Sequence, residues 1–279
     1  MGIKIVSDNC CDLPEDILHR YNIELACLPV RFGNQQYQCG EISNAEFYKL
    51  METSPVLPNT SQPSVDNFIN LYSRALEDGS EVIALHMSSG LSGTVQGAQV
   101  AGSMINNPRL HVVDSLKASV GLGLMVLQAA RMAEQGDSLP AILDRIDDMK
   151  KRVQCIFTVA NLEYLIKGGR LSRTKGLVAD IIDVKPILHV DEDGCVKPYD
   201  KARGHKGAMK KLLDIMEKTG SNLDSQTVGV CYAVSREDAG YLKEGIIHRW
   251  GNQEVITGEI GPVIGSHVGA GTCAVFYEK

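Results

Sequence analysis

The chain has 279 residues and is 44% hydrophobic, which is enough for one large domain or two ordinary ones. Its net charge of −6 argues against nucleic acid or an anionic membrane surface as the main partner. No run reaches the ~20 apolar residues of a membrane span, and the N-terminus leads straight into a strand. We therefore expect a cytoplasmic protein without stable membrane insertion.

The first half of the chain alternates strands with helices. Such alternation predicts a parallel, doubly wound sheet. Serines at 43, 64 and 138 are expected to cap three of the helices, the first in a capping box with Glu46. The predicted strands are 3–7, 23–32, 36–39, 81–87 and 110–113, and the predicted helices are 14–21, 43–52, 64–78, 94–105, 118–135 and 140–151.

The second half has a different pattern and predicts an α+β domain with mixed or antiparallel pairing. The charged segment 144–152 is expected to mark the boundary, which gives domains 1–153 and 154–279 with a ligand cleft between them. The predicted strands are 155–159, 186–190, 195–201, 228–234, 253–260 and 272–278, and the predicted helices are 162–166, 177–184, 206–219 and 236–250.

The eight cysteines contain no C-x-x-C pair, and several lie in apolar runs. A disulfide framework is not expected at this chain length, so we interpret them as buried free thiols of a reducing compartment. A redox role for the adjacent Cys10 and Cys11 is a less favoured alternative.

The stretch Ser88–Thr94 joins a short apolar strand to a helix through serines and glycines. Strand, Gly/Ser loop and helix form the plan of an anion site at a helix N-terminus. The loop contains no phosphate-loop lysine, so a single carboxylate suits it better than a triphosphate. A simple turn that caps the helix explains the same residues equally well.

A second hydroxyl-rich loop, Thr60–Ser64, precedes the helix that leads into this strand. Both loops could line the same end of a parallel sheet, where such folds bind ligands.

Three basic side chains in glycine-rich surroundings are further candidates. His267 lies within the glycine-rich connection 261–271, and a neutral imidazole there could donate to a carboxylate or accept a proton. Arg170 follows Gly168-Gly169, and Arg203 precedes Gly204; both could bind a phosphate or a partner, although the local sequence favours a solvated helix end or a salt bridge for each. The histidines have no metal-ligand spacing, so we expect no metal and no cofactor.

Seven short motifs, taken in order and spacing, resemble the DegV family of bacterial proteins that bind long-chain fatty acids. The matching stretches span nearly the whole chain. They are Ile5–Asp8 with Asp12–Pro14, Thr60–Ser64, Ser88–Thr94, Val113–Ser115 with Ser119, Gly121 and Gly123, Leu162–Leu165 through Gly168–Arg170, Lys185–Ile187, and Gly261–Gly271.

The resemblance implies a two-domain α/β protein of the EDD fold that is not itself an enzyme. It implies that an acyl chain such as that of palmitate is buried between the domains. The carboxylate would be held by Thr60, Ser61 and Ser92, with His267 supporting them. Some family members present the acid to a separate ATP-binding fatty acid kinase subunit, and Arg203 would then match an arginine at the kinase contact or phosphate position.

Two departures from the family pattern concern the site. Asn9-Cys10-Cys11 replaces a common Ser/Thr-Ala, and Gly269–Cys273 replaces a run that usually contains proline. An acyl hydrolase or transferase with a Ser92/His267 pair is the alternative function, although no acid partner for the histidine is evident. Nucleotide binding is the weakest hypothesis.

Overall fold

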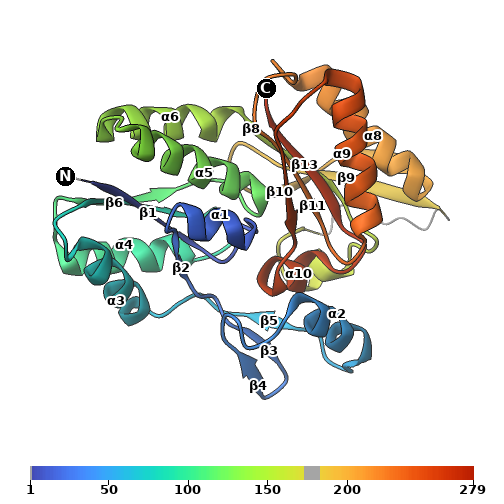
Figure 1. Cartoon of the computed structure of the whole chain (residues 1–279). Coiled ribbons are helices and arrows are strands. Elements are labelled where there is room, and N and C mark those ends of the chain that lie inside the picture. Colours follow the sequence, from blue (N-terminus) through green and yellow to red (C-terminus); the bar gives the residue numbers. More distant parts are fainter. Residues whose placement is uncertain (1, 173–182) are drawn as a thin grey trace.

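The computed structural model describes residues 2–172 and 183–279, which form two large sheets with α5 (Val120–Gln135) between them (Figure 1). Ten of the sixteen residues of α5 are buried. A Cβ on Gly121 would lie 2.6 Å from the sulfur of Cys155, and a Cβ on Gly123 would lie 2.7 Å from the Cys11 carbonyl oxygen. This close packing compensates for the low helix propensity of the two glycines. No helix of the described residues is long and apolar enough to cross a membrane.

The first sheet is wholly parallel, as the strand–helix alternation predicted. Helices α3 (Val65–Leu76) and α4 (Thr94–Ile105) cover one face, and α5 covers the other (Figure 1). The Ser64 hydroxyl accepts a hydrogen bond from the Asn67 amide and caps α3. The strand order is β2 (Glu24–Ala26), β1 (Ile3–Asp8), β6 (Glu81–His86) and β7 (Leu110–Asp114).

The second sheet has mixed pairing, since only β11 and β12 run parallel. Helices α8 (Gly204–Thr219) and α9 (Arg236–Trp250) pack on the face opposite to α5. The helix expected at 177–184 lies outside the described residues except for its end, where Val184 begins β9. The strand order is β10 (Val196–Arg203), β9 (Val184–Val190), β8 (Val153–Thr158), β13 (Cys273–Glu278), β11 (Val228–Tyr232) and β12 (Val255–Glu259).

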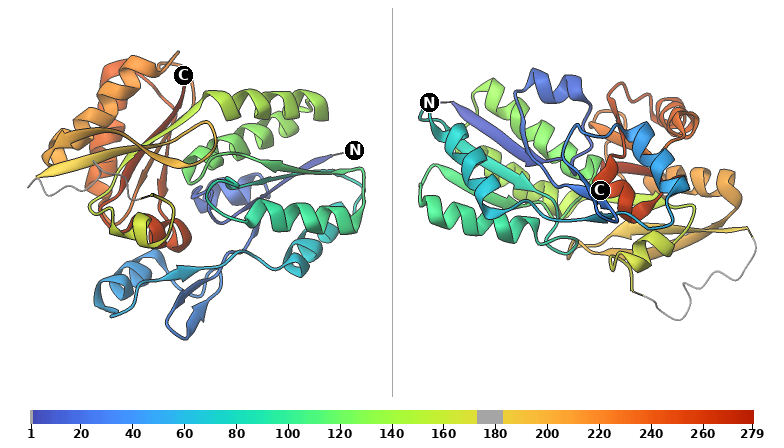
Figure 2. Two further views of the ribbon diagram at one scale, coloured as in Figure 1. Left: turned by 180° about the vertical axis from the view of Figure 1, so that it is seen from behind. Right: turned by 90° about the horizontal axis from the view of Figure 1, so that it is seen from below.

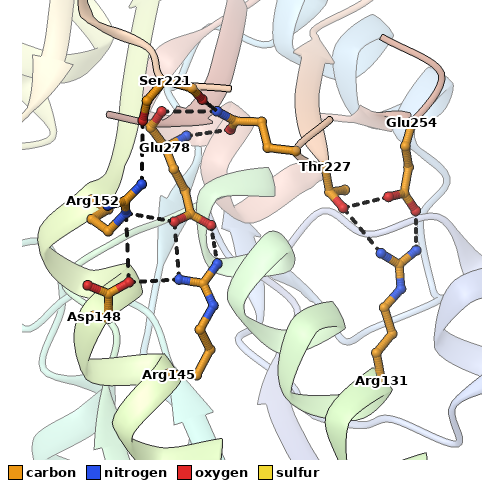
Figure 3. Close-up of polar contacts among 9 residues, drawn as sticks. Arg131, Arg145, Asp148, Arg152, Ser221, Thr227, Glu254 and Glu278 are labelled. Carbon is orange, nitrogen blue, oxygen red and sulfur yellow. Dashed lines mark hydrogen bonds and ion pairs between the residues drawn. The ribbon is translucent and has the colours of Figure 1, made fainter. Parts of the chain in front are cut away.

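Ion pairs connect the helices of the first half to the strands of the second half (Figure 3). In α6 (Leu139–Arg152), Arg145 and Arg152 both donate to Glu278 of β13, with distances of 3.1 Å from Arg145 Nη1 and 3.0 Å from Arg152 Nε to Glu278 Oε2. Arg131 of α5 likewise binds Glu254 beside β12. Helix α6 packs on both α5 and β13, so it contacts both halves of the chain. The domain boundary at 153/154 therefore stays a prediction.

A small third sheet lies apart from the large ones and next to α10 (Pro262–Val268) (Figures 1 and 2). The Tyr48 hydroxyl donates to the Ile260 carbonyl at 2.9 Å and ties this region to the second half. The sheet consists of β3 (Val30–Phe32), β4 (Gln35–Tyr37) and β5 (Asn59–Thr60), and the helix α2 (Asn44–Thr53) lies between β4 and β5 in the chain. The short helix α1 (Glu15–Arg20) comes earlier, between β1 and β2.

The single strand predicted over 23–32 is wrong, because the segment forms two strands that belong to different sheets. Pro29 cannot donate to a ladder, and the backbone N–H and C=O of Leu28 bind the side chain of Asn9 rather than a strand. The chain therefore leaves the first sheet after β2 and enters the small sheet at β3.

The expectation that all cysteines are free thiols is also wrong, since Cys27 and Cys39 form a disulfide with their Cα atoms 5.7 Å apart. The other six are free, and all except Cys195 are buried. Burial raises the pKa of Cys11 to about 12, and it also raises that of Cys10, which makes a redox role for this pair unfavourable.

Candidate functional site

A largely apolar cavity lies between the carboxyl end of the first sheet and the inner face of the second. Its volume is about 90 Å³, several times the minimum of about 10–15 Å³ that a single water needs. Its walls include Met87 after β6, Phe157 of β8, Phe276 of β13, and Val263 and Val268 of α10.

Four of the polar lining residues gather where the cavity opens to solvent. Most of the lining is buried, and the partly exposed members are Thr60, Leu91, Ser92, Arg170, Ile264 and His267. The structure therefore brings together four side chains that the sequence analysis selected, from β5, the Ser88–Thr94 loop, the segment after α7 (Glu163–Lys167) and α10.

His267 lies on helix α10, within a stretch whose glycines had indicated only a loop. Its Nε2 lies 2.8 Å from the Thr60 hydroxyl, and its Nδ1 is buried with no hydrogen-bond partner among the described residues. A Cβ on Gly168 would lie 2.5 Å from Nδ1, so a glycine is needed there. Burial, together with the Arg170 cation, lowers the pKa of His267 to about 4, so its imidazole is neutral at pH 7.

Arg170 is a half-buried cation at the same mouth. Its Nε donates to the Leu91 carbonyl at 2.9 Å and its Nη1 to the Gly168 carbonyl at 2.6 Å. Burial lowers the pKa of Arg170, yet a guanidinium stays charged at neutral pH. Because no carboxylate of the described residues lies within ion-pair distance, the site holds positive charge that an anion would balance.

The hydroxyl groups of the Ser88–Thr94 loop make two different kinds of contact. Ser92 lines the cavity, and its Oγ lies 2.8 Å from the Thr94 hydroxyl and accepts from the Thr94 amide at 3.3 Å. Ser88 instead donates to the Gly194 carbonyl at 2.8 Å, in the turn of the β9–β10 hairpin. The first part of the loop therefore joins the two halves, and only its second part faces the ligand space.

Two residues that the sequence analysis selected do not reach the cavity. Ser61 is exposed, and its backbone amide donates to the Pro29 carbonyl at 3.3 Å. The side chain of Arg203 is 92% exposed, and its Nε lies 3.9 Å from Asp183 Oδ2.

A buried polar pair beside the cavity was not among the residues predicted from the sequence. Ser119 lines the cavity and donates to Asp12 Oδ2 at 2.5 Å, while the Gly261 amide donates to Asp12 Oδ1 at 2.9 Å. Burial raises the pKa of Asp12 to about 7. The apolar wall was missed as well, although alternation along β8 and β13 would have placed Cys155, Phe157, Ala274 and Phe276 on one face.

An acid–histidine pair does exist, but it lies away from the cavity. His86 Nδ1 lies 3.0 Å from Asp8 Oδ2, and His86 Nε2 lies 2.6 Å from the Tyr72 hydroxyl. Asp8, Tyr72 and His86 are fully buried and do not line the cavity, so they stabilise the first sheet. Within residues 2–172 and 183–279, no three acidic, histidine or cysteine side chains cluster as a metal site.

The chain is similar to a known protein family over nearly its whole length. Residues 2–279 match the family model described as "Uncharacterised protein, DegV family". A DegV domain-containing protein of Caldanaerobacter subterraneus is 34% identical over 278 residues, which cover 99% of each chain.

Two solved structures with similar folds are described as fatty acid binding. A family member from Thermus thermophilus has a TM-score of 0.92 and 33% identity, with both chains fully covered. DegV of Bacillus subtilis has a TM-score of 0.90 and 30% identity, with 100% of this chain and 99% of that chain covered.

Proposed function

Since this chain belongs to the DegV family, we propose that it binds one long-chain fatty acid, such as palmitate, in the cavity between its two halves. The observation that carries this proposal is an apolar cavity lined at its mouth by a cation without a carboxylate partner among the described residues. An acyl chain would fill the cavity, and its carboxylate would meet Arg170. The solved relatives described as fatty acid binding support the same ligand class.

The head group would be recognised by hydrogen bonds as well as by charge. Thr60 and Ser92 each supply a hydroxyl, and neutral His267 can supply one N–H. Ser61 is left out of this set because it is exposed and does not line the cavity.

The tail would provide most of the binding free energy. Burial of about fourteen methylenes contributes on the order of 10 kcal/mol before the costs of ordering the chain and the partners. The polar mouth would mainly decide which end of the ligand faces solvent.

Mass spectrometry of lipid extracted from the purified protein tests this proposal. We expect a long-chain fatty acid near one equivalent, and delipidated protein should bind palmitate in calorimetry. Protein that carries no acyl ligand and takes up none would contradict the proposal.

We further propose that the bound acid is presented to a separate ATP-binding fatty acid kinase subunit. The support is the family resemblance, together with an arginine, Arg203, whose side chain is almost fully exposed. The test combines this chain with such a subunit, ATP and magnesium, and measures acyl phosphate. Arg203→Ala should lower the rate while palmitate affinity stays unchanged.

The hydrolase alternative is less well supported by the contacts. The Ser92 hydroxyl is paired with Thr94, and His267 is paired with Thr60, so no nucleophile–base hydrogen bond joins Ser92 to His267. Ester turnover that Ser92→Ala abolishes would revive this alternative.

A further inference from the structure

The Cys27–Cys39 disulfide lies beside the ligand cavity rather than at a remote surface. The residue that follows Cys27 is Leu28, a buried wall residue of the cavity. Cys39 is exposed and Cys27 is half-buried, so a small thiol reagent can approach the pair from solvent. Residues 27 and 39 enclose the β3–β4 hairpin, so the disulfide closes the base of that hairpin.

We propose that Cys27 and Cys39 form a reversible thiol–disulfide site whose state sets the affinity of the cavity for its acyl ligand. The effect on affinity depends on the proposed fatty acid binding, whereas the thiol chemistry does not. Two chains of contacts lead from the sulfurs to the cavity.

The first chain of contacts passes through Asn9. Its side-chain Oδ1 accepts from the Leu28 amide at 3.0 Å, and its Nδ2 donates to the Leu28 carbonyl at 3.1 Å. The same Nδ2 lies 3.2 Å from the Cys39 sulfur. Asn9 therefore holds the backbone of a cavity-wall residue and one sulfur of the disulfide at the same time.

The second chain of contacts passes through β3. Val30 pairs with Thr60 in the small sheet, and Thr60 in turn contacts His267 at the cavity mouth. β5 has only two residues, so β3 is what holds Thr60 in register. Opening the disulfide frees both ends of the hairpin and allows Leu28 and Thr60 more conformations. Binding must then order them again, which lowers affinity.

The polar environment of the sulfurs favours exchange. The Cys39 amide donates to the Cys27 sulfur at 2.8 Å, and Asn9 donates to the Cys39 sulfur. N–H donors stabilise a thiolate, and a stabilised thiolate is a better leaving group in thiol–disulfide exchange.

The reductant would be a dithiol. One of its thiolates attacks the exposed Cys39 sulfur, the S–S bond breaks, and the Cys27 sulfur leaves with the electron pair and takes up a proton. The second thiol of the reductant then attacks the mixed disulfide, releases the Cys39 sulfur as a thiol, and closes the reductant's own disulfide. Two electrons and two protons pass to the protein in this exchange.

The test uses the full chain with dithiothreitol as the dithiol and glutathione disulfide as the oxidant. Alkylation after rapid denaturation, read by intact mass, should find six reactive thiols in the oxidised form and eight in the reduced form. Palmitate affinity by calorimetry should fall on the order of tenfold on reduction and return on reoxidation.

Two variants separate this mechanism from general damage. Cys27→Ser/Cys39→Ser should bind palmitate like the reduced protein and should not respond to dithiothreitol. Cys195→Ser removes the one free thiol that is not buried and should respond like the wild type.

The proposal would be overturned if the oxidised form (six thiols) and the reduced form (eight thiols) bound palmitate with equal affinity. It would also be overturned if the disulfide were reduced only after unfolding. If neither form binds any acyl ligand, the proposed function fails, and amide exchange at Leu28 and Thr60 then decides the thiol site. Faster exchange on reduction would support it, and unchanged exchange would overturn it.

Discussion

The Thr60 hydroxyl lies 2.8 Å from His267 Nε2, and this contact joins residues 207 positions apart at the mouth of an apolar cavity. Thr60 comes from the small sheet, and His267 comes from a helix of the second half. The contact positions a neutral imidazole beside the Arg170 cation, so a ligand head group would meet both halves at once.

Replacing Thr60 by valine keeps the side-chain shape and removes the hydroxyl. We expect palmitate affinity to fall about fivefold, since a neutral hydrogen bond contributes roughly 1 kcal/mol and His267 loses its partner. Calorimetry measures this change. Ser61→Ala is the matched control and should change affinity little; a larger effect of Ser61→Ala than of Thr60→Val would contradict the assignment.

Replacing Arg170 by glutamine removes the cation at the mouth. A hydrogen bond to a charged group contributes roughly 1.5–3 kcal/mol, so palmitate affinity should fall about ten- to a hundredfold. The affinity for hexadecanol, which has no charge, should fall much less, and competition between the two ligands measures the difference. Arg203→Gln serves as the control with unchanged palmitate affinity, and equal losses for both ligands in Arg170→Gln would argue against a carboxylate contact.

Gly168 should be intolerant of a side chain. A Cβ there would lie 2.5 Å from His267 Nδ1 and 2.9 Å from the Tyr164 carbonyl oxygen, so Gly168→Ala must displace the histidine or the short helix α7. We expect a lower melting temperature and weaker palmitate binding, consistent with the roughly 1–3 kcal/mol cost of overpacking. In contrast, Gly207→Ala, in open space on α8, should be neutral or slightly stabilising.

Asp12 should make stability depend on pH. Its pKa is raised to about 7 in the folded state from an ordinary value of 3.8, so the folded protein binds more protons than the unfolded chain between these values. The contribution of Asp12 to stability is fully present below pH 3.8 and is lost as pH rises through about 7.

Asp12→Asn removes this titration. The free energy of unfolding of the variant minus that of wild type should therefore be more positive at pH 8 than at pH 5, so the variant gains stability relative to wild type as pH rises, as measured by urea denaturation. Asp16→Asn, an exposed change on α1, should give the same difference from wild type at both pH values. A difference for Asp12→Asn that does not vary with pH would show that the carboxyl is not shifted upward.

Much of the fold could be predicted because its signals are local. The serines at 43, 64 and 138 cap their helices as expected, and the Ser43/Glu46 capping box forms. The break between β2 and β3 could not be predicted in this way, because its causes are distant. Leu28 binds Asn9 nineteen positions away, and Cys27 bonds to Cys39.

The order of apolar runs, caps and glycines along the chain determined the parallel first sheet, the mixed second sheet and the list of polar candidates, since each signal lies within a few neighbouring residues. The tertiary structure alone decided which candidates meet. Thr60, Ser92, Arg170 and His267 line one cavity, whereas Ser61 and Arg203 face solvent. A cavity is bounded by side chains from segments far apart in sequence, and their distances depend on how whole sheets and helices pack together.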